Sequence, residues 1–214
     1  MDEEIKIIDA KTRNEKIKIF FVTNKKLLMS SLIILILIVL SFYSYQIYKD
    51  GHREQLSEKY NSALINYEGG DKSKTTQIMK EVIEDKDSTY SPLALYFLID
   101  NKLIKNKAEI NDLFDIIIKK TPLENEIKNL IIYKKALYNA EISSENELLN
   151  TLSPLINSKS VWKSHALYLI AEYFYSKKEE QKAKEFFKQI LETENANQDI
   201  IKKAQKRLNR DLSE

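Results

Sequence analysis

A long apolar run at residues 27–48 constrains this chain more than any other feature of its sequence. Residues 27–42 contain no charged side chain, and three serines are their only polar breaks. At a rise of about 1.5 Å per residue, the run forms a helix of roughly 33 Å, enough to cross a bilayer core of about 30 Å. Lysines precede the run, and tyrosines followed by a lysine close it, as is typical of a bilayer interface. The pattern predicts a transmembrane helix.

A buried core helix and a cleaved signal peptide are the two other interpretations of this run. The charged flanks of an all-round apolar helix disfavour the first. The second requires a 26-residue n-region, and residues 39–41 only faintly resemble a cleavage site. The chain has no cysteine, which excludes a lipoprotein anchor, disulfides and thiolate metal sites. We therefore expect an uncleaved anchor.

The distribution of basic side chains predicts the orientation of the span. Residues 1–26 carry seven Lys or Arg side chains, more than the same length of chain after the span. Because positive flanks stay in the cytoplasm, we expect a cytoplasmic tail at 1–26 and translocation of residues 49–214. Phe20 and Phe21 among lysines allow either an interfacial helix or a solvated tail, and we favour the tail.

Residues 49–214 are predicted to form one all-α domain. Apolar residues recur at helical spacing, strict alternation is rare, and the whole chain has only three glycines and three prolines. Breaks occur at glycine, proline and serine clusters, and the short gaps require neighbouring helices to pack antiparallel. The predicted helices are 52–68, 72–86, 92–105, 109–120, 124–141, 145–157, 161–177, 179–193 and 197–211.

The second helices of successive pairs share one apolar stripe. In each, a small or medium residue is followed at +4, +7 and +8 by large apolar residues, and the copies are 35, 38 and 35 residues apart. Four copies at such a period predict a helical solenoid. The alternative is a generic helical bundle in which these spacings coincide by chance. The four stripes are Thr75, Met79, Val82 and Ile83; Ile110, Phe114, Ile117 and Ile118; Leu148, Leu152, Leu155 and Ile156; and Ala183, Phe187, Ile190 and Leu191.

The first helices repeat the same spacing more loosely. One position in each first helix, which is alanine in three of the four pairs, lets the two helices of the pair approach closely. The residue three positions earlier, a tyrosine or a leucine, fills the gap to the neighbouring pair. The helix at 197–211 is expected to cap the last pair with a basic, polar face. The small positions are Ala63, Leu98, Ala136 and Ala171, and the residues before them are Tyr60, Leu95, Tyr133 and Tyr168.

The last pair resembles a tetratricopeptide repeat. Asn195 replaces the closing proline of that motif, and Thr75 and Ile110 stand where earlier units would have alanine. The whole chain resembles the YfgM-type family of bacterial inner-membrane proteins: charged tail, one span, then degenerate tetratricopeptide units. The resemblance implies a periplasmic domain associated with translocation-channel subunits, periplasmic chaperones or emerging polypeptides. The positions that match the repeat are Leu167, Ile170, Ala171, Phe174, Ala183, Phe187 and Ile190.

A solenoid would expose a curved inner surface lined by the first helix of each pair. Tyrosines there can hold an extended polypeptide or a partner helix, because they combine broad apolar contact with a hydroxyl that tolerates water. The alternative is that most of them, like Trp162, fill the seams between repeats. The aromatic residues on these helices also include Tyr96, Tyr138 and Phe174. The candidate partner-binding residues are Tyr60, Tyr67, Tyr133, Tyr168 and Tyr175.

The sequence does not predict an enzyme. His52 and His165 have no partner at metal-binding spacing, and Gly69-Gly70 lacks a phosphate-loop pattern. A net charge of +2 disfavours nucleic acid, and we expect no metal, cofactor or small-molecule substrate. We expect a membrane-anchored protein-interaction module. The alternatives are a scaffold or assembly factor of an envelope complex without client binding and, in the opposite orientation, a cytosolic adaptor.

Overall fold

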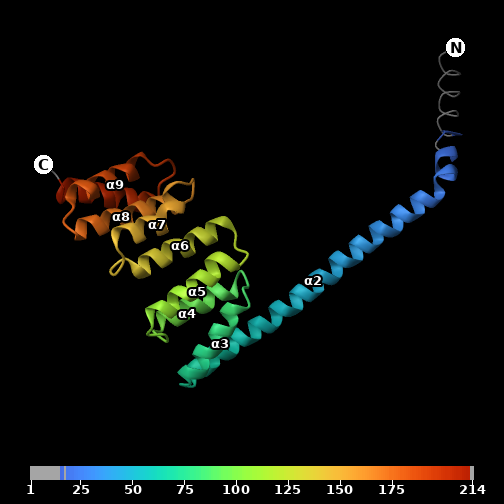
Figure 1. The fold of residues 1–214 in the computed structure, drawn as a ribbon, viewed down its shortest axis with the longest axis horizontal. Coiled ribbons are helices and arrows are strands. Elements are labelled where there is room, and N and C mark those ends of the chain that lie inside the picture. Colours follow the sequence, from blue (N-terminus) through green and yellow to red (C-terminus); the bar gives the residue numbers. More distant parts are fainter. Residues whose placement is uncertain (1–14, 17, 213–214) are drawn as a thin grey trace, which may run out of the picture. The chain divides into compact units, whose positions relative to one another are not determined.

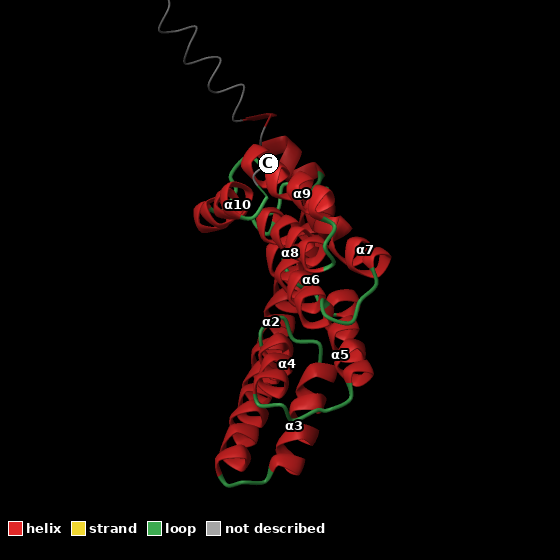
Figure 2. Cartoon of the chain, turned by 90° about the vertical axis from the view of Figure 1, so that its left-hand side faces the viewer, coloured by secondary structure: helices red, strands yellow, loops and turns green. Residues whose placement is uncertain are grey.

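A computed structural model describes residues 15–16 and 18–212. Over these residues the chain is all-helical and contains no strand (Figure 2). It divides into two compact units, Met1–Gln55 and Leu56–Glu214. The helices are α2 (Lys25–Glu68), α3 (Lys72–Glu84), α4 (Tyr90–Asp100), α5 (Lys107–Lys120), α6 (Asn125–Asn139), α7 (Glu145–Ile156), α8 (Lys163–Ser176), α9 (Glu180–Glu192) and α10 (Gln198–Arg210).

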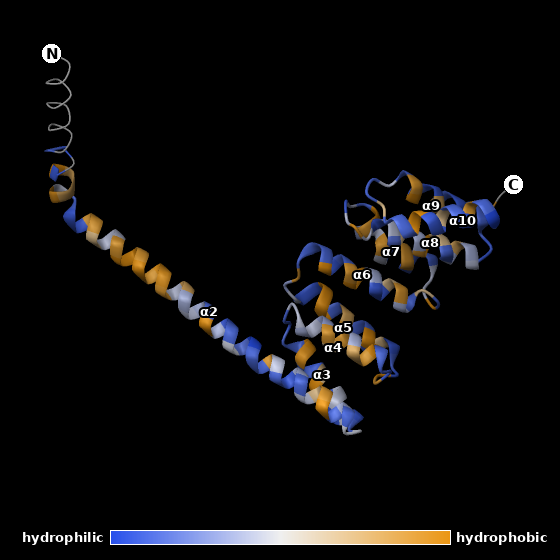
Figure 3. Cartoon of the chain, turned by 180° about the vertical axis from the view of Figure 1, so that it is seen from behind, coloured by the Kyte–Doolittle hydropathy of each residue, from blue (hydrophilic) through white to orange (hydrophobic). Residues whose placement is uncertain are grey.

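The apolar run lies in α2, which is long and apolar enough to cross a membrane. Figure 3 shows its apolar segment in orange, followed by a hydrophilic segment toward the glycine pair. The side chains of the run are exposed to their surroundings, except for Leu28, which is half-buried. Ser30 and Ser31 donate hydroxyl hydrogen bonds to the carbonyls of Leu27 and Leu28, at 2.9 and 3.0 Å. These bonds satisfy the hydroxyl donors inside the helix, so the serines do not disqualify it as a span.

The predicted punctuation residues begin several of the helices. Asp71, after Gly70 in the left-handed region at φ 87°, accepts a hydrogen bond at the start of α3. Ser144 and Glu147 form a reciprocal capping box at the start of α7. Asn197 accepts bonds from two backbone N–H groups of α10. Such caps satisfy donors that have no partner inside the helix, which explains why the breaks fall at these polar residues.

The structure departs from the prediction at α2, where the span expected at 27–48 and the helix expected at 52–68 form one unbroken helix, Lys25–Glu68, because nothing at residues 49–51 interrupts the helical hydrogen bonds. Among the later helices, α4 differs most from its prediction, 92–105. It begins two residues before Pro92, which sits in the first turn, where its missing N–H breaks no intrahelical bond. It ends at Asp100 because Lys102 adopts a left-handed conformation at φ 52°. The N–H of Leu103 then bonds to the carbonyl of Leu98 at 2.9 Å, a Schellman-type end.

Within the unit Leu56–Glu214, helices pack in the order in which they follow along the chain (Figure 1). From α3 onward, each helix contacts its successor, and contacts also join α3 to α5, α6 to α8, and α8 to α10. The end of α2 joins this stack, since the hydroxyl of Thr75 on α3 donates to the carbonyl of Ala63 at 3.2 Å. The contacts of α8 with both α6 and α10 therefore place these three alternate helices next to one another.

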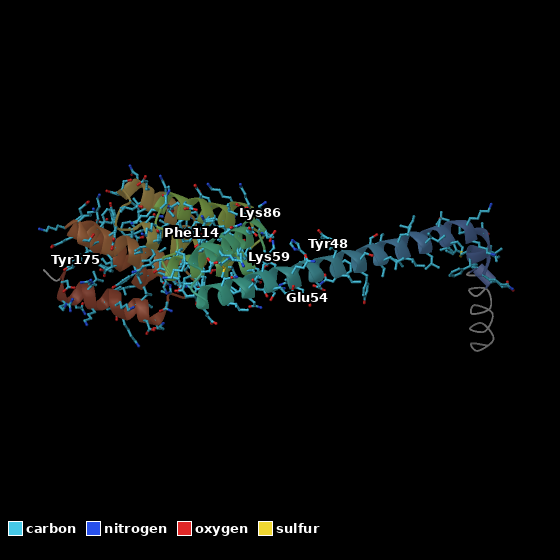
Figure 4. The ribbon with its side chains drawn as sticks, turned by 90° about the horizontal axis from the view of Figure 1, so that it is seen from below. Tyr48, Glu54, Lys59, Lys86, Phe114 and Tyr175 are labelled. Atoms are coloured by element: carbon cyan, nitrogen blue, oxygen red, sulfur yellow. The ribbon has the colours of Figure 1, made fainter. Side chains whose placement is uncertain are left out.

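The buried side chains form two clusters that meet at α6. One cluster extends from the end of α2 to α6, where Ile131 belongs to it, and Phe114, labelled in Figure 4, is among its largest members. The other extends from α6 to α10, and Ile132 and Ala136 begin it. The core is thus divided along the chain rather than concentrated at one centre.

Most residues of the predicted stripes are buried. Ile118 and Ile156 are half-buried, and the prediction is wrong for Leu191, which is 41% exposed at the outer edge of α9. The four small positions of the first helices are all sealed in the core. These buried positions are Ala63, Leu98, Ala136 and Ala171.

Candidate functional site

The five candidate tyrosines lie on alternate helices and all are half-buried. The end of α2 carries two of them, α6 carries one and α8 carries two, of which Tyr175 is labelled in Figure 4. Each contacts a ring or a cation from a later helix. They are therefore distributed along the stack and do not form a single cluster.

Tyr60 and Tyr67 join the end of α2 to α4. The ring of Tyr60 lies 5.8 Å from the ring of Tyr90, and that of Tyr67 lies 5.2 Å from Phe97 in an edge-to-face arrangement. Burial raises the pKa of Tyr60. Both rings use much of their apolar surface in these contacts and expose only their remaining edges.

Tyr133 joins α6 to the start of α8. Its ring stacks on Trp162 at 5.9 Å and meets His165 edge-on at 5.8 Å. Burial, and then the nearby charge of Lys203, lower the pKa of His165. The buried Nδ1 of His165 has no hydrogen-bond partner in the described part of the chain. This group is an aromatic seam in which a charged imidazolium is disfavoured.

The two tyrosines of α8 lie close to the last helices. Tyr168 packs edge-to-face on Phe187 of α9 at 5.6 Å, and burial followed by the hydrogen bond to Glu172 raises the pKa of Tyr168. The guanidinium of Arg207 lies 4.8 Å from the ring centre of Tyr175. Phe174 is fully buried in the core. This agrees with its prediction as a core position of the last pair and removes it from the aromatic residues that could line an exposed surface.

An apolar groove that the sequence did not predict lies between α4 and α6. One part has a volume of about 600 Å³, and a separate hollow of about 170 Å³, also lined by Phe114 of α5, lies farther along both helices. Tyr96 lines both parts. Leu93 and Ile127, exposed by 44% and 41%, sit on its walls. These aliphatics occupy helical spacing like that of core residues, so sequence alone gives no signal that they face solvent.

Two further features bear on what the surface can bind. A polar hollow of about 780 Å³ between α3 and the α4–α5 connection is lined mainly by lysine, glutamate and hydroxyl side chains. Within residues 15–16 and 18–212, no group of three or more His, Asp or Glu side chains is arranged to hold a metal ion.

Comparison with family models, curated proteins and solved structures found no match to this chain.

Proposed function

We propose that this protein is a membrane-anchored protein–protein interaction module. The observation that carries the proposal is the combination of one apolar helix of membrane-spanning length with a helical unit that exposes an apolar groove. Exposed apolar concavities are typical of interaction sites. Anchoring confines the module to the membrane plane, so that weak contacts with neighbouring membrane proteins gain from a raised effective concentration.

We further propose that Leu56–Glu214 is a tetratricopeptide-like solenoid. The spacings of 35 and 38 residues and the burial of equivalent positions in successive helix pairs support this. Contacts between alternate helices, such as α6 with α8, are those that stacked pairs would make. Helix α10, with a lysine-rich outer face and buried Ile200 and Ala204, then acts as the cap.

The proposed setting is a bacterial inner membrane, with residues 1–26 in the cytoplasm and the helical unit in the periplasm. The lysine bias of the tail and the resemblance to the YfgM-type family support it. The proposed partners are translocation-channel subunits, periplasmic chaperones or emerging polypeptides. Protease treatment of spheroplasts tests the orientation: digestion of the helical unit supports it, and protection until lysis contradicts it.

Copurification tests the function itself. Full-length chain and a chain lacking residues 1–48 are compared after gentle solubilisation. The proposal predicts that membrane partners copurify with the full chain only; unchanged copurification after the deletion would contradict it. Photocrosslinkers placed at Tyr67 and Tyr175 distinguish client binding from the scaffold alternative. Crosslinks to diverse partners, including channel subunits, indicate client binding. Crosslinks to one stoichiometric partner indicate a scaffold.

A further inference from the structure

A short helical segment precedes α2. Residues 15–16 and 18–23 are helical, and a turn at Asn24 separates them from α2, which begins at Lys25 (Figure 1). The backbone N–H and the side-chain amide of Asn24 both donate to the carbonyl of Phe20, at 2.9 and 3.0 Å. The sequence favoured a solvated tail at these residues, whereas the structure gives them a defined helical conformation.

Four consecutive apolar side chains of this segment are exposed. Successive residues of a helix point about 100° apart, so four in a row place apolar groups on every side of it. The rings of Phe20 and Phe21 lie 6.1 Å apart in an edge-to-face arrangement. A helix that is apolar all round is normally buried, so a fully solvated segment is disfavoured. The four residues are Ile19, Phe20, Phe21 and Val22, exposed by 64, 57, 58 and 70%.

The proposed membrane span determines what lies next to these side chains. The apolar run begins at Leu27, six residues after Phe21. At a helical rise of about 1.5 Å per residue, Phe21 is about 9 Å from the start of that run. The headgroup region extends about 5–8 Å beyond each side of the hydrocarbon core. Residues 19–22 therefore lie at the edge of the bilayer if the segment points straight outward, and inside the headgroup region if it tilts.

Lysines flank the apolar residues on both sides. Glu15 precedes them, and no acidic side chain follows before the end of the apolar run of α2. Long lysine stems can reach phosphate groups while neighbouring apolar residues are immersed, and four or more basic residues beside a span attract anionic phospholipids. All four lysines are exposed, and none forms an ion pair with another described residue. They are Lys16, Lys18, Lys25 and Lys26.

We infer that residues 18–23 are immersed in the headgroup region of one leaflet and that the four lysines bind its anionic phospholipids. Phe20 and Phe21 enter the boundary between headgroups and acyl chains, where aromatic rings are favoured. This inference rests on the proposed function, because it takes residues 27–48 as a span, and it adds a lipid-binding site to the anchor. It holds in either orientation of the chain.

The depth of the segment is measured in nanodiscs of phosphatidylcholine, which leave both bilayer faces open to solutes. The chain has no cysteine, so Val22→Cys provides a single site for a nitroxide label. Leu35→Cys in the span and Glu84→Cys, exposed on α3, supply the references for lipid and for water. The label at position 22 is expected to collide more often with oxygen, which concentrates in lipid, than with a neutral water-soluble nickel chelate.

Substitution of the aromatic rings tests what holds the segment in the bilayer. Phe20→Ser together with Phe21→Ser is expected to raise collisions of the position-22 label with the chelate at least twofold. Ile65→Ser is the matched control, because it removes an apolar side chain that is 69% exposed near the other end of α2. The control is expected to leave the collision rates unchanged.

Nanodiscs that also contain phosphatidylglycerol test the role of the lysines. The anionic lipid is expected to lower collisions of the position-22 label with the chelate. Lys16→Gln together with Lys18→Gln should reduce this effect at least by half, because fewer ammonium groups then attract the headgroups. Lys72→Gln together with Lys74→Gln changes two exposed lysines of α3 and should leave the effect intact.

Three results would overturn the inference. One is a label at position 22 that meets the chelate as often as the label at position 84. The others are an unchanged rate in the Phe20 and Phe21 variant, and an undiminished effect of phosphatidylglycerol in the Lys16 and Lys18 variant. If the label at position 35 is in lipid while that at position 22 is in water, the proposed anchor stands and this inference alone fails. If both are in water, the span itself fails.

Discussion

The guanidinium of Arg207 on α10 forms a bidentate pair with the carboxylate of Glu172 on α8. Nε donates to Oε1 at 2.8 Å and Nη2 donates to Oε2 at 2.7 Å. Nη1 also donates to Asp211 at 2.8 Å, and the guanidinium covers the ring of Tyr175. Arg207 therefore joins the last helix to α8 through the charged pair with Glu172 and the face of Tyr175, while its bond to Asp211 holds the end of α10.

Loss of this junction is expected to loosen α10. Arg207→Ala should lower the free energy of unfolding by about 1 kcal/mol, because a half-exposed bidentate pair is worth more than an ordinary surface pair but less than a buried one. Arg207→Lys should recover only part of this, since lysine cannot form the two parallel bonds. Denaturant unfolding of the full chain in micelles measures the difference. Arg210→Ala, a more exposed neighbour, serves as control and should have a smaller effect.

Because the core consists of two clusters, a substitution that destabilises one cluster should loosen the helices of that cluster more than those of the other. Phe187→Ala should cost about 3–5 kcal/mol, as for other buried phenylalanines. Because Phe187 belongs to the cluster of α6–α10, hydrogen exchange should accelerate there while α3 and α4 keep their protection. Phe114→Ala, in the other cluster, should give the opposite pattern. Equal acceleration throughout both clusters in either variant would contradict the division.

The small positions of the first helices predict a steric effect. Ala171 is sealed in the core of α8, so Ala171→Leu should force neighbouring side chains apart and lower the free energy of unfolding by about 1–3 kcal/mol. Ala108→Leu introduces the same side chain on the exposed start of α5 and should change stability little. Thermal melting in micelles compares the two. If the Ala171→Leu chain has the same melting temperature as the wild-type chain, close approach of the helices at this position is not required.

His165 predicts a dependence of stability on pH. Its pKa is lowered below 6.5 in the folded chain, so the unfolded chain binds its proton first as pH falls. The free energy of unfolding should therefore decrease as pH drops through and below 6.5. His165→Phe should flatten this decrease between about pH 7.5 and 5.5, the range around an ordinary histidine pKa. His52→Gln, outside the unit Leu56–Glu214, should keep the wild-type slope; a flattened slope there would contradict the assignment.

Much of the fold follows from local patterns. Helical spacing located the helices, and caps such as Ser144 fixed where they begin, because these signals act within one turn. The sequence did not predict the Schellman end of α4, because the left-handed residue at such an end is usually glycine, whereas here it is Lys102, at φ 52°. The groove between α4 and α6 was missed for a different reason. Leu93 and Ile127 are separated by 34 residues, and only tertiary packing decides that both remain exposed.

Pairings between distant residues also depend on the tertiary structure. Arg207 was predicted to lie on a polar capping face, but nothing in its spacing indicated Glu172 as its partner. The tyrosine positions were predicted on the first helices, while their exposed fraction was not. In physical terms, periodicity determines which face of a helix is apolar, and the neighbouring helix determines how much of that face is covered.

Alkaline carbonate extraction combined with intact-mass measurement tests the membrane anchor most directly. The account predicts that the full chain stays in the membrane pellet and that its mass includes residues 27–48. A Leu35→Arg and Ile36→Arg double variant, with two charges in the apolar run, should be released or fail to insert. Release of the wild-type chain into the soluble fraction, or a mature mass lacking the apolar run, would contradict a membrane-anchored module.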